Sequence, residues 1–189
     1  MKLLFVDCCI SQRGKESRTL ALAKAYIDAF RAAHPDWEVE RADPMDLPPL
    51  TAEFLDDRDT RKGEFSAPMF AAARQFQSAD SIVVAAPYWD LSYPAQLKTY
   101  IEHISVNGLC YHYTEQGCQG DCKAEKLVYL TSGGDFEGED SVGVLHWKQL
   151  CKMFGIETFT YVFAGGMDID PVKKPELLAQ ACEKARSLV

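Results

Sequence analysis

The stretch Lys2–Thr19, KLLFVDCCISQRGKESRT, decides how this chain folds. Its apolar run at residues 3–6 predicts a short strand that is buried on both faces, as in a parallel sheet. A polar loop follows, and an amphipathic helix is expected to begin near Ser17. In open α/β folds such a loop faces the ligand, and the N–H groups at the helix start favour an anion. We therefore interpret residues 9–19 as a phosphate loop, with Ser17 and Thr19 as hydroxyl donors.

A simpler interpretation of the same loop needs no ligand. Ser17 would cap a surface helix, while Arg13, Lys15 and Arg18 would be solvated. The loop alone leaves both interpretations open, and the rest of the chain favours the phosphate.

Length and composition indicate an ordinary globular protein. At 189 residues, 47% apolar and 25% charged, the chain is expected to form a single domain, residues 1–189. The net charge of −8 argues against nucleic acid or an anionic membrane as partner. The sequence contains no apolar run that could span a bilayer and no signal-peptide layout, so we expect a cytoplasmic protein. An odd number of cysteines, seven, favours reduced thiols.

Strands and helices are expected to alternate along the chain. The strands are expected at residues 3–6, 37–42, 81–86, 126–131 and 157–164, and the helices at 17–33, 66–78, 94–104 and 142–154 and from Pro171 onward. This alternation predicts an α/β fold with a doubly wound five-stranded parallel sheet and helices on both faces. A strand order of 2-1-3-4-5 would bring together the loops at 9–19, 87–91 and 131–135.

Three further expectations concern the packing of these elements. The first helix should bury a stripe of Leu20, Ala23, Ile27 and Phe30. The segment 43–65 is too long for a simple connection and is expected to carry a short helix or a partner-facing loop. Alternating tyrosines and turn residues within 107–120 predict a small hairpin outside the main sheet.

The sequence resembles one known family at three places. The stretch ESRT at residues 16–19 is similar to that family's phosphate turn, and APYWDLSYPAQLKTYIEHI at 86–104 matches its most specific segment. The third place begins with YHYTEQG at 111–117 and continues through LTSGG at 130–134 to YVFAGG. Together these residues resemble the flavodoxin-like FMN-dependent NAD(P)H:quinone oxidoreductase and azoreductase family over nearly the whole chain.

The resemblance implies a binding site for FMN. Its phosphate would lie near Cys9 and be bound by Ser17, Arg18 and Thr19. The residues matching those that line the flavin ring are Pro87, Tyr88, Trp89, Asp90 and Leu91, and those matching the third loop are Thr131, Ser132, Gly133 and Gly134. Asp90 replaces a frequent Asn, and its negative charge would lower the flavin potential.

The activity implied is oxidation of NADH or NADPH and reduction of quinones, azo compounds or similar small-molecule acceptors. Hydride would pass through flavin N5 in a ping-pong cycle, so no side chain is expected to act as a nucleophile. Trp89 and His146 are candidates for the substrate slot, and the family implies a homodimer that uses segment 43–65 and the Tyr111–Gly117 hairpin. The alternative is a flavodoxin-like electron carrier or FMN-binding regulatory module without turnover, and a fold that has lost FMN is a third interpretation.

Several candidate residues have plainer interpretations. Tyr88 and Trp89 could be core packing at a strand end, the two glycines at 133–134 a simple turn, and His146 a helix-packing residue. Cys118 and Cys122, with Cys110 nearby, do not have the spacing of a zinc or iron–sulfur site, so we expect no metal.

Overall fold

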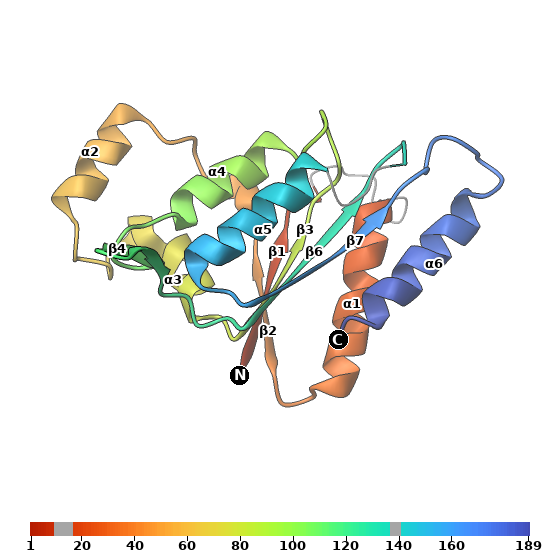
Figure 1. Cartoon of the computed structure of the whole chain (residues 1–189), viewed down its shortest axis with the longest axis horizontal. Coiled ribbons are helices and arrows are strands. Elements are labelled where there is room, and N and C mark those ends of the chain that lie inside the picture. Colours follow the sequence, from red (N-terminus) through yellow and green to blue (C-terminus); the bar gives the residue numbers. More distant parts are fainter. Residues whose placement is uncertain (10–16, 137–140) are drawn as a thin grey trace.

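The computed structural model describes residues 1–9, 17–136 and 141–189 (Figure 1). Its main sheet has five strands in the order β2-β1-β3-β6-β7, and every neighbouring pair is parallel. The strands are β1 (Lys2–Asp7), β2 (Glu38–Ala42), β3 (Ser81–Ala85), β6 (Lys126–Ser132) and β7 (Thr158–Ala164). Counted among these five strands, the order is the expected 2-1-3-4-5, with β3 at the centre and β2 at an edge.

Helices cover both faces of this sheet, as Figure 1 shows. On one face lie α1 (Arg18–Ala33) and α6 (Lys174–Arg186), and on the other lie α3 (Ala71–Ser78), α4 (Ala95–Ile104) and α5 (Val142–Phe154). Side chains alternate along β1, so Leu3 and Phe5 join one core while Leu4 and Val6 join the other. Burial on both faces explains the continuous apolar run with which the chain begins.

Helix α1 buries a wider stripe than its spacing predicts. Ala23, Ile27 and Phe30 are buried as expected, but Leu20 is half-buried, and Leu22 and Tyr26 are almost fully covered instead. The reason is that α1 packs against α6 as well as against the sheet. A helix with two neighbours needs an apolar surface broader than one face.

The long segment after β2 contains the expected short helix. A 3-10 turn (Pro44–Asp46) precedes α2 (Ala52–Thr60), which has the Thr51 hydroxyl as its N-cap and buries none of its residues. A second 3-10 turn (Pro68–Phe70) leads into α3, which therefore begins later than predicted. In Figure 1, α2 projects from the side of the molecule that carries α3 and α4.

The predicted hairpin is also present, as β4 (Tyr111–Thr114) paired antiparallel with β5 (Gly117–Gly120). Its end packs against the last turn of α5, where Gly155 adopts a left-handed conformation with φ of 78°. A Cβ added at Gly120 would lie 2.0 Å from the backbone nitrogen of Gly155. The two backbones touch here, which requires glycine at position 120.

Candidate functional site

A cleft of about 350 Å³ opens beside the carboxyl ends of the central strands. Its described lining is Ser17, Arg18, Thr19, Pro87, Tyr88, Trp89, Ser132, Gly133, Gly134 and Asp168. Three of the four segments are the loops that the strand order brings together, and the fourth follows β7. The volume falls within the range of about 300–1,000 Å³ that small-molecule pockets occupy.

The first wall of the cleft is the start of α1. Ser17 has extended backbone angles and accepts the N–H of Leu20 with its hydroxyl at 3.3 Å, so it is the N-cap. The first turn contains no acidic residue, which leaves the positive end of the helix dipole available to an anion. Residues 10–16 of the predicted phosphate loop lie outside the described residues.

A buried hydrogen bond joins this wall to the third loop. The hydroxyls of Thr19 and Ser132 are 2.7 Å apart, and these residues are 2% and 7% exposed. The contact fixes the first turn of α1 against the end of β6. Thr131 is fully buried, so its side chain does not line the cleft.

Two glycines form the second wall, and one of them lies in close contact with aromatic rings. A Cβ at Gly133 would lie 2.9 Å from the Phe163 ring and 3.1 Å from the Tyr88 ring. One at Gly134 would lie 2.7 Å from a carboxylate oxygen of Asp168. At Gly133 the missing side chain lets the backbone lie close to these two rings, whereas at Gly134 the neighbouring atom is the end of an exposed side chain.

The third wall is the loop after β3. The N–H of Tyr88 donates to the carbonyl of Ser132 at 3.0 Å, and the Tyr88 ring meets Phe163 edge to face at 5.3 Å. Trp89 is 44% exposed, so it is not core packing. The loop thus offers an aromatic surface beside bare backbone.

A tight turn ends this aromatic wall. The N–H of Ser92 donates to the carbonyl of Trp89 at 2.8 Å. Both central residues, Asp90 and Leu91, have positive φ angles, 50° and 62°. This is the arrangement of a type I′ turn, which normally requires Gly or Asn and is strained for leucine. Neither central residue is among those that line the cleft in this structure.

The fourth segment was not predicted from the sequence. Asp168 follows β7, and its carboxylate pairs with the Arg18 guanidinium at 2.9 Å. Its N–H donates to the carbonyl of Gly134 at 3.0 Å, which holds the two loops together. The rule that ligands bind at strand carboxyl ends would have identified this loop had it been applied to the last strand as well.

Cys9 and His146 are not among the residues that line the cleft. The Cys9 thiol points toward the carbonyl of Ala85, and burial, reinforced by the Asp7 carboxylate, raises its pKa. His146 stacks on Tyr93 and its Nδ1 forms a short hydrogen bond with the Tyr93 hydroxyl. Burial, with a smaller effect of Lys98, lowers the pKa of His146, so the ring is neutral near pH 7.

The cysteines of the hairpin region are separate thiols. Cys118 is exposed, while Cys122 is partly buried with its sulfur 3.6 Å from the carbonyl oxygen of Cys110. In the part of the chain that the structure describes, no three His, Cys, Asp or Glu side chains are grouped so that they could hold a metal ion.

None of the described helices combines the length and apolarity needed to cross a membrane.

Comparisons with known proteins extend over the whole chain. The profile of the family described as "Flavodoxin-like fold" matches residues 1–189. An FMN-dependent NADH:quinone oxidoreductase of Clostridium beijerinckii is 32% identical over 191 residues, covering 98% of this chain and 96% of that protein. One from Clostridium acetobutylicum is 32% identical over 193 residues, covering 98% and 96%.

Solved structures agree in fold. An azoreductase from Bacillus anthracis superposes with a TM-score of 0.87 at 24% identity, covering 100% of this chain and 98% of that one. A second B. anthracis protein, an FMN-dependent NADH-azoreductase in complex with FMN, gives 0.81 at 19% identity, covering 99% and 98%. At these identities the superpositions establish the shared fold.

Proposed function

Because this chain belongs to the flavodoxin-like family of FMN-dependent NAD(P)H:quinone oxidoreductases and azoreductases, we propose that it is such an oxidoreductase itself. NADH or NADPH would donate electrons, and a quinone, an azo compound or a similar small molecule would accept them. The observation that carries this proposal is the cleft, where a helix start, an aromatic loop and two bare glycines face the same space.

The residues of the cleft fit FMN. Its lining combines hydroxyls and a guanidinium at the start of α1 with the rings of Tyr88 and Trp89 and with glycine backbone. A Cβ at Gly133 would collide with the Phe163 and Tyr88 rings, so glycine is required where this backbone lies against them. Polar donors together with a flat apolar surface are the two kinds of contact that a phosphate joined to a flavin ring requires.

We assign the phosphate to Ser17, Arg18 and Thr19 and the ring to the loop Pro87–Leu91 and to the backbone of residues 131–134. The Thr19–Ser132 bond would hold these two groups of residues at a fixed separation. Cys9 and Thr131 contribute to the shape of the loops rather than to side-chain contacts, because the Cys9 thiol faces a carbonyl and Thr131 is fully buried.

When bound, FMN supplies a ring nitrogen that accepts and gives hydride. The protein's part is orientation. Phe163 holds the Tyr88 ring edge to face, and the half-exposed Trp89 provides a flat surface on which nicotinamide and acceptor can stack in turn. One slot used by both reactants implies a ping-pong cycle. We assign no proton transfer to His146, since its Nδ1 is engaged by Tyr93.

We further infer how the chain is organised. The two helical layers support a doubly wound sheet and a single domain over residues 1–189. The protruding α2, which buries nothing, and the exposed hairpin support a homodimer that covers both segments. Seven free thiols support a reducing compartment, the cytoplasm.

The visible spectrum of the purified protein tests the proposal. After incubation with FMN and gel filtration, we expect a retained oxidised-flavin spectrum that bleaches anaerobically with NADH or NADPH and recovers when a quinone is added. Retained flavin that neither nucleotide bleaches would instead indicate an electron carrier or regulatory module. A protein that retains no flavin would contradict the proposed cofactor site.

A further inference from the structure

Among the described residues that line the cleft there is one positively charged and one negatively charged side chain, and the two form an ion pair. Of the lining residues in the described ranges, only Arg18 and Asp168 are charged. Two Arg18 nitrogens approach the two carboxylate oxygens at 2.9 and 3.5 Å. The guanidinium that would attract a phosphate therefore already has a partner on the opposite wall of the cleft.

The two side chains differ in how firmly they are held. The Arg18 side chain is 17% exposed, while that of Asp168 is 61% exposed. The Asp168 backbone is anchored, because its N–H donates to Gly134 and the preceding N–H of Met167 donates to Gly133 at 3.2 Å. The carboxylate can therefore turn toward water while the loop that carries it stays in place.

A phosphate and a carboxylate would compete for this arginine. Both present two oxygen acceptors to the planar fork of a guanidinium, and two anions on one cation repel each other. We propose that Asp168 is an internal competitor for the flavin phosphate: it holds Arg18 in the empty cleft, yields it when FMN binds, and so limits FMN affinity. This inference rests on the proposed function and names a residue that sets the affinity of the same site.

Riboflavin, which has the flavin ring but lacks the phosphate, separates this effect from a general change in the cleft. We would titrate the flavin-free protein with FMN and with riboflavin by flavin fluorescence. Asp168→Asn should tighten FMN binding by about threefold to tenfold, the size of one partly exposed charge interaction. Riboflavin binding should change by less than about twofold.

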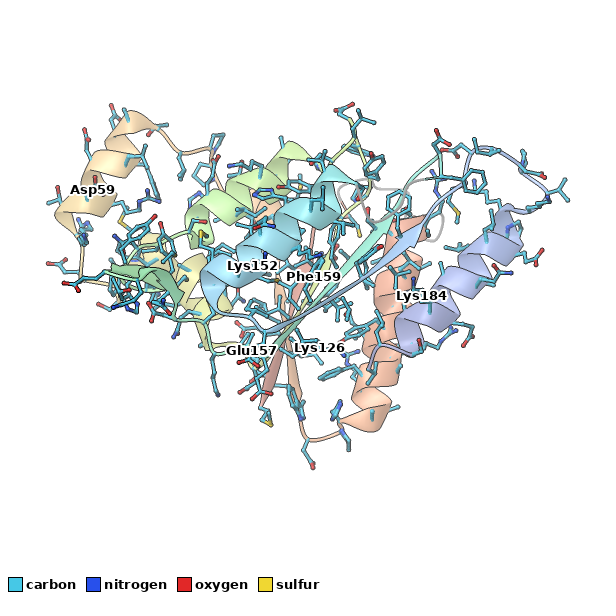
Figure 2. The ribbon with its side chains drawn as sticks, in the orientation of Figure 1. Asp59, Lys126, Lys152, Glu157, Phe159 and Lys184 are labelled. Atoms are coloured by element: carbon cyan, nitrogen blue, oxygen red, sulfur yellow. The ribbon has the colours of Figure 1, made fainter. Side chains whose placement is uncertain are left out.

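A double-mutant cycle tests whether Arg18 carries the effect. Arg18→Gln should weaken FMN binding, and adding Asp168→Asn to it should give a clearly smaller gain than in the wild type. Glu157→Gln is the matched control, because it removes an exposed charge of the same sign just before β7 (Figure 2). Asp168 follows the other end of that strand. This control should leave FMN affinity unchanged.

The outcomes are distinct. The competition would be overturned if Asp168→Asn bound FMN no more tightly than the wild type does. It would also be overturned if Asp168→Asn gained as much affinity for riboflavin as for FMN, or if Glu157→Gln gained as much affinity for FMN as Asp168→Asn. A full gain in the Arg18→Gln background would overturn it as well. If the wild type binds neither flavin, the proposed function fails as well, whereas FMN binding that is indifferent to Asp168 defeats this inference alone. Thermal unfolding of each variant reports whether the fold is intact.

Discussion

The Thr19–Ser132 hydrogen bond gives the most direct test of how the cleft is assembled. The two hydroxyls are 2.7 Å apart in a region from which water is nearly excluded. Thr19→Val keeps the shape of the side chain and removes the hydroxyl, so Ser132 is left buried without this partner. An unsatisfied buried hydroxyl costs about 1–3 kcal/mol. Valine and threonine have similar helix propensities, so that loss should dominate.

The free energy of unfolding in urea, measured without flavin, tests this prediction. Thr19→Val and Ser132→Ala should each lower it by about 1–3 kcal/mol. The double variant should lose less than the sum, with a coupling of about 1 kcal/mol, because no hydroxyl is then orphaned.

Thr60→Val is the matched control, since the Thr60 hydroxyl donates to Asp56 on exposed α2. It should change stability by less than about 0.5 kcal/mol. The prediction would be contradicted if Thr19→Val and Ser132→Ala were as stable as this control. It would also be contradicted if the double variant lost the full sum of the two single losses in free energy of unfolding, because the buried bond would then not join the two walls.

Three further changes test other parts of the structure. Gly120→Ala should cost about 3 kcal/mol or more in urea unfolding, because the new Cβ would meet backbone at 2.0 Å; a loss below about 1 kcal/mol would contradict that contact. Leu91→Asn should be about 1 kcal/mol more stable than Leu91→Ala, because asparagine tolerates the observed φ of 62°; equal midpoints would argue against the strained turn. The pKa of His146 is lowered in the folded state, so unfolding takes up a proton and stability falls as pH drops below about 6.5. His146→Gln should flatten that fall between about pH 8 and pH 5.5, and an unchanged slope would contradict it.

Local patterns in the sequence were enough to predict most of the fold. The alternation of strands and helices predicts a parallel sheet, because parallel strands need crossovers, and the order 2-1-3-4-5 is one of the two common orders of such sheets. The cap at Ser17 was predicted from residue type. The family resemblance pointed to three of the four segments that line the cleft.

The remaining features depend on contacts between distant residues. Asp168 pairs with a residue 150 positions away, and no local pattern encodes that partner. The left-handed turn at Asp90–Leu91 lacks the glycine that usually marks it. His146 pairs with Tyr93 because α5 lies beside that loop, a packing that spacing along one helix does not encode.

The distance along the sequence between the residues that line the cleft has a consequence for biosynthesis. Ser17 and Asp168 lie near opposite ends of the chain, so the binding site spans almost the entire order of translation. A nascent chain that has formed the first three strands of the sheet still lacks both the glycine loop and Asp168. Such long-range closure is slow, and the growing polypeptide would be unable to retain its coenzyme until the last strand has been added. Flavin retention would then report complete synthesis, and C-terminally truncated products should be recovered colourless.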